Sequence, residues 1–155
     1  MSGIKVRVKG NLATMARFHG EATQETLADV GRLWHHEMLP PHFTTEGGRR
    51  YNYAKRSEKY MIRKAKQHGH QRPLVFSGYT EKSAKAIRDI RATRQRVKVT
   101  LHTRALNFLA KRGMGRDEVI AVDPRDATTL QRAYDRDYTR RMRQAASGRP
   151  TMRGN

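Results

Sequence analysis

Residues 42–78, HFTTEGGRRYNYAKRSEKYMIRKAKQHGHQRPLVFSG, combine a turn, a Tyr-x-Tyr pair, a short basic helix and an apolar exit. Between Arg49 and Arg72 there are nine basic residues and a single acid, Glu58, which together give this part a net charge of +8. The nine are Arg49, Arg50, Lys55, Arg56, Lys59, Arg63, Lys64, Lys66 and Arg72. Because so many like charges repel one another, the stretch needs a partner or strong solvation. It therefore predicts a contact surface for something negative, and it does not have the character of a catalytic pocket.

The order of residues within this stretch also predicts its local structure. Gly47-Gly48 permits a sharp turn, so we expect residues 43–56 to form a protruding basic loop. Ser57 is a good N-cap for a short helix that ends at Gly69. The apolar run 74–76 is too short for an element of its own, and it is expected to plug into the core. Insertion of the same run into a neighbouring subunit is the alternative.

The whole chain has 155 residues, a net charge of +19, 36% hydrophobic residues and no cysteine. This length suits one domain, for which we expect residues 1–147, followed by a flexible basic tail at 148–155. The hydrophobic share is below the roughly 45–50% of typical domains, a range that also counts glycine. A thin core completed by neighbouring subunits is therefore expected. Without cysteines there are no disulfides, and without a long apolar run or signal peptide we expect a soluble protein made in the cytoplasm.

Upstream of the basic stretch the hydrophobic pattern changes period once. Residues 4–9 alternate apolar and basic side chains, which is typical of a half-buried strand. From Asn11 the spacing is helical, and the helix is expected to bend near Gly20 and to stop at Pro40-Pro41. Its apolar stripe holds the only tryptophan, Trp34, which we expect to anchor the core; the stripe consists of Leu27, Val30, Trp34 and Met38.

Downstream, alternation predicts a hairpin and one further strand. Residues 80–86 can form a helical turn, and the hairpin is expected at 88–93 and 97–102 with its turn at 94–96. A last strand is expected at 118–123. The C-terminal helix follows, with Asp123 as its N-cap and Pro124 at its first position. Its apolar face is predicted to be Ala127, Leu130, Tyr134, Tyr138 and Met142, and Ser147 ends it. The fold class is therefore α+β: a long N-terminal helix and a C-terminal helix packed on a small antiparallel sheet, with an extended basic loop.

The candidate chemical groups favour structural roles. Adjacent His35 and His36 point about 100° apart on a helix, and His68 and His70 lie among cations, so we expect neither pair to bind a metal. Carboxylates spaced by four on the first helix (Glu21, Glu25 and Asp29) and a close pair on the last (Asp135 and Asp137) are expected to balance basic neighbours on solvated faces. No P-loop or nucleophile elbow is present in the sequence. We predict no enzyme activity and no cofactor; a small nuclease is the weakest alternative.

The basic surface is the positive signal for function. Neither a helix-turn-helix spacing nor an RNP-type aromatic motif is found, so sequence-specific readout of nucleic acid is not expected. Non-specific attraction to DNA phosphates and docking to an acidic protein remain open. The candidate partner- or DNA-contacting residues are Arg49, Arg50, Tyr51, Tyr53, Lys55, Arg56, Lys59, Arg63, Lys64 and Lys66.

The stretch that opens this section resembles a group of small virion proteins of tailed bacteriophages. These are the tail-completion or head–tail joining proteins, also described as neck, virion morphogenesis or minor tail proteins. The matching motifs are HF at 42–43, RRYNYAKRSEKYMIRKAK at 49–66, a Gly-x-x-x-Pro-Leu-Val spacing at 69–75 and FSG at 76–78. The downstream order of a strand pair, an Asn-Phe-Leu segment at 107–109 and a terminal amphipathic helix is also similar.

The resemblance implies a structural role in the virion, in a ring at the neck between head and tail. The implied partners are further copies of the chain, portal or adaptor proteins, tail-tube or terminator proteins, and packaged double-stranded DNA held non-specifically. No membrane is implied. The alternative is a non-specific nucleic-acid-binding protein of ribosomal or nucleoid type.

Overall fold

The structure is a computed structural model that describes residues 12–75, 77–86, 89–101 and 116–147. The described chain is mostly helical with one small antiparallel sheet, which confirms the predicted α+β class. Its helices are α1 (Leu12–Leu33), α2 (Gly47–Arg50), α3 (Glu58–His68), α4 (Tyr79–Lys85), α6 (Arg116–Val119) and α7 (Pro124–Ala146). A π-helical turn at Trp34–Met38 and a 3-10 turn at Pro40–Phe43 follow α1, and the strands are β1 (Asp89–Ala92) and β2 (Val97–Thr100).

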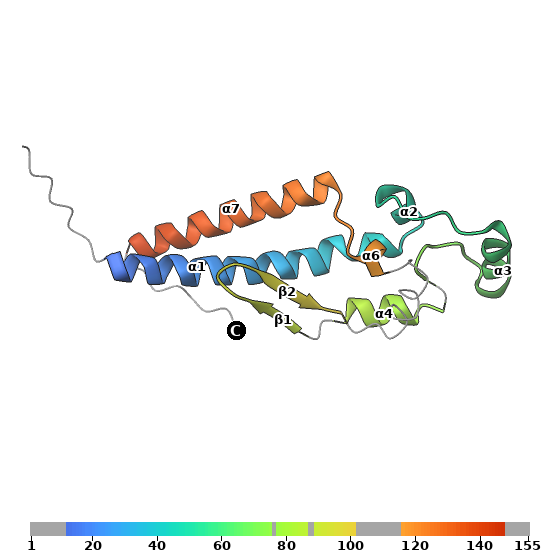
Figure 1. Ribbon diagram of the computed structural model, residues 1–155, viewed down its shortest axis with the longest axis horizontal. Helices are drawn as coiled ribbons and strands as arrows, with labels where there is room; N and C mark the ends of the chain where they lie inside the picture. The colour runs from blue at the N-terminus through green and yellow to red at the C-terminus, as the bar shows by residue number, and fades with distance from the viewer. Residues whose placement is uncertain (1–11, 76, 87–88, 102–115, 148–155) are drawn as a thin grey trace, which may run out of the picture.

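The central helix α1 has a partner on each side. Figure 1 shows α7 running antiparallel to α1 along one side, while the β1–β2 hairpin lies on the other. The two terminal helices therefore pack mainly on each other, and the sheet packs on α1. The helices α2 and α3 lie beyond the C-terminal end of α1, at one end of an elongated molecule (Figure 1).

Glycines on α1 allow the hairpin to approach closely. A Cβ atom added at Gly31 would lie 2.7 Å from Cγ2 of Val97 on β2. At Gly20, where a bend was expected, α1 continues as one helix. A Cβ there would lie 2.6 Å from Nε of Arg94, in the hairpin turn. Both glycines thus serve as packing positions for the hairpin, which explains why two poor helix formers are tolerated in the helix interior.

The predicted antiparallel hairpin is confirmed, and residues 93–96 lie between its strands, one residue more than the expected turn. Ile90 faces Val99 and Ala92 faces Val97 in the antiparallel pair. Thr93 closes the turn, because its amide donates to the carbonyl of Arg96 at 2.8 Å. Residues 4–9, which were expected to form another strand, lie outside the described residues, as does the predicted tail at 148–155.

Charged and aromatic groups join α7 to α1. The guanidinium of Arg141 pairs with Glu25 and, at 2.6 Å, with Asp29, one turn apart on α1. The same two helices also meet where Nδ1 of His19 on α1 and the hydroxyl of Tyr138 on α7 are 2.5 Å apart. Glu25 and Asp29 therefore balance basic neighbours, as the sequence predicted: both bind Arg141 of the other helix, and Asp29 also binds Arg32 on α1.

The buried face of α7 differs from the predicted apolar face. Ala127 is exposed, whereas Asp126, Ala133 and Asp137 are buried. The prediction counted apolar side chains only. Asp126 and Arg141 make contacts with other parts of the chain, so the packed face of α7 is rotated toward these charged residues relative to the predicted apolar face.

The core lies where α1 ends and the basic stretch begins. Its buried apolar residues are Leu39, Phe43, Leu74, Val75, Ala84 and Val119, with Trp34, Tyr53 and Leu101 packed against them. The prediction that residues 74–76 plug into the core is confirmed for Leu74 and Val75; Phe76 lies outside the described residues. Trp34 is only partly buried, so it borders the core that it was expected to anchor.

Two local predictions are wrong. Residues 118–123 do not form a strand: α6 includes Glu118 and Val119, and no strand of the described chain pairs with the residues after it. Ile120 and Val122 are exposed, so only Val119 reaches the core. The segment 43–56 is not a free loop either, because Phe43 and Tyr51 are buried and α2 lies between them. Apolar and ring contacts hold this segment against the body of the molecule.

Candidate binding surface

The candidate site is the basic end of the molecule, defined here as residues 47–73, which include α2 and α3. The helix α3 begins and ends as the sequence predicted. Ser57 is its N-cap, with the side-chain oxygen accepting from the amide of Tyr60, and Gly69 ends it in the left-handed conformation at φ 68°. These signals fix where the cations of α3 lie relative to the body.

Arg50 connects the basic end to the start of α7. Its Nε donates to Asp123 at 2.6 Å, and its Nη2 donates to Asp126. Asp123 in turn caps α7, because its carboxylate accepts the amide of Asp126 at 2.7 Å. The hydrogen bond with Asp123 raises the pKa of Arg50 further. Arg50 is therefore a structural cation, and its charge is already balanced within the chain.

Tyr51 and His42 form a stacked pair beneath this ion pair. Their ring centroids are 3.6 Å apart with an angle of 8° between the planes. The hydroxyl of Tyr51 donates to Asp126 at 2.9 Å. Burial, helped by this carboxylate, raises the pKa of Tyr51. The phenol is thus held neutral inside the molecule and is not displayed to a partner.

The tautomer of His42 follows from its neighbours. A carbonyl can only accept, so Nδ1–H donates to the carbonyl oxygen of Glu118 at 3.0 Å, with the Tyr53 hydroxyl 2.5 Å away. The buried Nε2 has no hydrogen-bond partner among the described residues. A proton there would be buried without an acceptor, and burial lowers the pKa of His42 to about 4. Burial likewise raises the pKa of Tyr53.

Arg56 and Lys64 are also committed to the fold. The guanidinium of Arg56 binds Glu118 in a two-point arrangement, with Nη1–Oε1 at 3.0 Å and Nη2–Oε2 at 2.5 Å. Lys64 is 2% exposed, and its ammonium donates to the carbonyl of Arg72. Burial lowers the pKa of Lys64 to about 8. Neither side chain is free to reach outward to a partner.

The remaining predicted contact residues are exposed, and none of them forms an ion pair with another described residue: Arg49, Lys55, Lys59, Arg63 and Lys66. Arg63 lies over the Tyr60 ring at 5.9 Å from its centroid. The ten predicted residues are thus divided. Arg50, Tyr51, Tyr53, Arg56 and Lys64 hold the basic end in place, and the five exposed cations form its outer surface.

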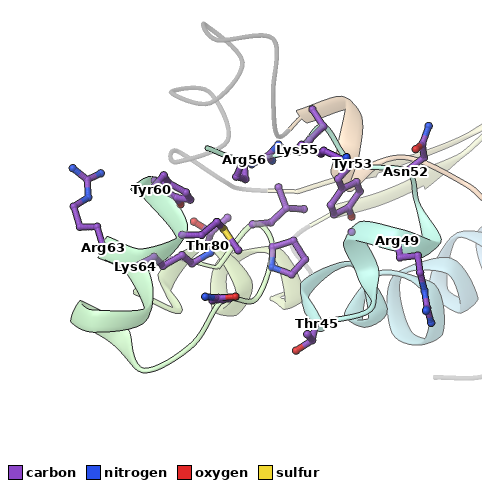
Figure 2. Close-up of a pocket in the computed structure, with 16 residues that line it drawn as sticks. Thr45, Arg49, Asn52, Tyr53, Lys55, Arg56, Tyr60, Arg63, Lys64 and Thr80 are labelled. Atoms are coloured by element: carbon purple, nitrogen blue, oxygen red, sulfur yellow. Dashed lines mark hydrogen bonds between the residues drawn. The ribbon is translucent and has the colours of Figure 1, made fainter. Parts of the chain in front are cut away.

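Three of the exposed cations border a pocket of about 1010 Å³ between α2, α3 and residues 71–80. Figure 2 shows Arg49 of α2 and Arg63 of α3 at opposite ends of it, with Lys55 between them along the chain. Its lining residues are Thr45, Gly48, Arg49, Asn52, Tyr53, Ala54, Lys55, Arg56, Tyr60, Met61, Arg63, Lys64, Gln71, Pro73, Leu74 and Thr80. No carboxylate is among these described residues. We call this hollow the α2–α3 pocket; Lys59 and Lys66 lie outside its lining.

Sequence reasoning missed the acids that organise this end. Asp123 was identified only as a helix cap, and Glu118 was assigned to a strand. Asp126 was recognised only as an acid three residues after that cap, although it binds both Arg50 and Tyr51. The only local signal was an unusual density of acids, at 117, 118, 123 and 126, in a strongly basic chain.

The histidines and acids show no metal-binding arrangement in the part of the chain that the structure describes, where no group of three or more could hold an ion. His68 and His70 stack on each other at 6.2 Å between centroids. None of the described helices has the length and hydropathy of a membrane span. Comparisons with protein-family models, curated proteins and solved structures found no match.

Proposed function

We propose that this chain is a structural virion protein of a tailed phage. In this proposal, copies of the chain form a ring in the head–tail neck, which joins the portal or connector side to the tail and lets DNA pass. The observation that supports it best is the positive charge at one end of an elongated subunit, on five exposed side chains that form no ion pair with another described residue. The resemblance of residues 42–78 to tail-completion proteins indicates the particular setting.

Most acids of the chain already pair with basic residues of the same chain, so they do not neutralise the exposed cations of the basic end. The acids that form ion pairs within the described chain are Glu21, Glu25, Asp29, Glu81, Asp89, Glu118, Asp123, Asp126 and Asp137. With a net charge of +19, the chain has too few further carboxylates to neutralise its exposed cations. Counter-charge from outside is therefore expected, from DNA or from acidic faces of neighbouring proteins.

The small core and the exposed apolar side chains also favour assembly into a ring. Among the described residues the core consists of a few side chains where α1 meets the basic stretch, and the large apolar residues Met15, Ile62, Tyr79, Ile120 and Val122 are about half exposed or more. Neighbouring copies can cover such residues through head-to-tail contacts that close into a ring. The proposed activity is mechanical joining, and no bond is made or broken by the chain.

The experiment is an assembly assay in the phage that encodes the chain. Alanine at the five exposed cations (Arg49, Lys55, Lys59, Arg63 and Lys66) should yield heads and tails that fail to join or that leak DNA, seen by electron microscopy. Arg50 and Arg56 are left intact, because they stabilise the fold. The matched control places alanine at five exposed cations elsewhere: Arg96, Lys98, Arg125, Arg132 and Arg143.

The alternative, a non-specific nucleic-acid-binding protein, gives a different result. Such a protein would bind duplex DNA as a monomer at about 0.15 M salt, with affinity that falls steeply as salt rises. It would be absent from purified particles. Normal infectious particles from the five-alanine variant, together with this monomeric DNA binding, would refute the neck proposal.

A further inference from the structure

The α2–α3 pocket has an apolar floor and a cationic border. Met61, Pro73 and Leu74 line it with apolar surface, and the Tyr53 ring adds to them. Arg49, Lys55 and Arg63 lie around it and are exposed. Its volume of about 1010 Å³ is of the size of pockets that hold ligands. The combination selects for an occupant that is both negative and partly apolar.

Backbone strain is concentrated at the same place. Asn52 and Leu74 have φ angles of 51° and 56°, and they are the only non-glycine residues with positive φ in the described chain. Both line the pocket. Asparagine adopts this conformation readily, but leucine does so rarely. Leu74 belongs to the hydrophobic core and is only 8% exposed, and this packing stabilises its positive φ angle. Such strained residues recur at ligand clamps.

The fixed cations and the exposed ones contribute differently. Arg56 and Lys64 line the pocket but are bound to Glu118 and to the carbonyl of Arg72. The charge of Arg56 is offset by Glu118, and the ammonium of Lys64 already donates within the chain, so neither offers a free donor to an occupant. Arg49, Lys55 and Arg63 are exposed at its border, and the guanidinium of Arg63 lies 5.9 Å from the centroid of the Tyr60 ring, which also lines the pocket. The border can therefore pair with several carboxylates spaced along a chain.

We propose that the α2–α3 pocket binds a short acidic segment of a neighbouring protein, which inserts an apolar side chain between flanking carboxylates. The inference rests on the proposed function, since it supplies the partner class of a protein that joins others. Duplex DNA fits less well, because it is a convex rod that has no apolar side chain to place on Met61 and Leu74. A second copy of this strongly basic chain would repel the border.

The test measures binding of fluorescent peptides to the full chain by anisotropy at about 0.15 M salt. The panel contains short glutamate-rich peptides with one central leucine, isoleucine, methionine, phenylalanine, tyrosine or tryptophan. A glutamate-only peptide of equal charge and a short DNA duplex serve as comparison ligands. At least one anchored peptide should bind roughly tenfold more tightly than the glutamate-only peptide, as burial of one apolar side chain predicts.

Two pairs of variants locate the binding. Met61→Asp should weaken the anchored peptide roughly tenfold or more, because it places a charge on the apolar floor. Ile62→Asp is its control, since this adjacent side chain is 59% exposed and does not line the pocket. Charge reversal to glutamate at Arg49, Lys55 and Arg63 should weaken binding by a similar factor. Reversal at Arg125, Arg132 and Arg143 on α7 changes the net charge equally and should alter affinity by about twofold at most.

Each result supports or overturns binding of the acidic segment in the α2–α3 pocket, provided that thermal unfolding shows the variants to be folded. If Met61→Asp is unfolded, protection of the pocket segments from hydrogen exchange when the peptide binds the unaltered chain takes its place. Equal affinity for all peptides would show charge attraction alone and overturn the pocket. Tighter binding of the duplex, lost with the same border residues, would make the partner a nucleic acid and also overturn it. Failure here with head–tail joining still abolished by the five-alanine variant would leave the neck proposal standing without this partner.

Discussion

The hydroxyl of Tyr51 donates a hydrogen bond to the carboxylate of Asp126, 75 positions further along the chain, at 2.9 Å. The same carboxylate receives the guanidinium of Arg50 and is 4% exposed. One acid at the start of α7 therefore satisfies two groups of the basic stretch at once.

Asp126→Ala should lower the free energy of unfolding by about 2–3 kcal/mol, because it removes the carboxylate acceptor of the buried Tyr51 hydroxyl and one of the two acids that Arg50 binds. Denaturant titration measures the change. Asp135→Ala is the control on the same helix, where the side chain is exposed; its effect should stay within about 0.5 kcal/mol. Equal effects of the two substitutions would show that the Tyr51–Asp126–Arg50 contact carries no stability.

Gly31→Ala should destabilise the chain even though alanine is the better helix former. The new Cβ would lie 2.7 Å from Val97 on a strand that cannot retreat without losing its packing on α1. Overpacking of about 1–3 kcal/mol should exceed the gain of roughly 1 kcal/mol in helix propensity. Gly20→Ala provides the contrast, because its contact is the flexible end of Arg94, which can move. Thermal unfolding should place the two variants on opposite sides of the unaltered chain; a stabilised Gly31→Ala would contradict the close packing.

Acid should destabilise the chain through His42. Its pKa is about 4 in the folded chain and 6.5 when unperturbed, so between these values the unfolded chain binds the extra proton. Stability is therefore complete above pH 6.5 and is lost as the pH falls toward 4, by up to about 3 kcal/mol. Urea midpoints across this range should fall less steeply for His42→Asn, which does not titrate. Parallel curves for the two proteins would rule out a buried neutral imidazole.

Alkali should have the opposite effect through Lys64. The folded chain releases this proton near pH 8, but the unfolded chain holds it to 10.5. Stability should thus rise from pH 8 to just below 10, where unfolded tyrosines begin to ionise and reverse the trend. We expect a rise of roughly 1–2 kcal/mol, and none in Lys64→Met. A flat profile for the unaltered chain would mean that water reaches this ammonium.

The elements that the sequence predicted well depend on local chemistry. The cap at Ser57, the stop at Gly69, the cap at Asp123 and the turn at 94–96 all follow from groups within a few residues of one another. Such signals act before tertiary packing, and packing left them unchanged. The same holds for the hairpin strands, whose alternating side chains already suit a one-sided contact with α1.

The candidate site was less predictable because its anchors are distant in sequence. Arg50 and Arg56 resemble Arg49 and Lys55 in every local respect, yet the first two meet Asp123 and Glu118, far along the chain. Only tertiary contacts distinguish the cations that stabilise the fold from those that are exposed. The strand expected at 118–123 failed for a related reason: alternation alone does not provide a neighbouring strand to pair with.

The anchoring of Arg50 and Arg56 by α6 and α7 has a consequence for how the chain is made. During synthesis the basic stretch leaves the ribosome well before Glu118, Asp123 and Asp126 exist to receive it. For that interval Arg50 and Arg56 lack the carboxylates that they bind in the folded chain, and the nascent chain can bind ribosomal RNA or another nearby polyanion. Folding of the basic end must therefore await the last part of translation. A message cut short upstream of Glu118 would yield a fragment without these ion pairs that binds polyanions.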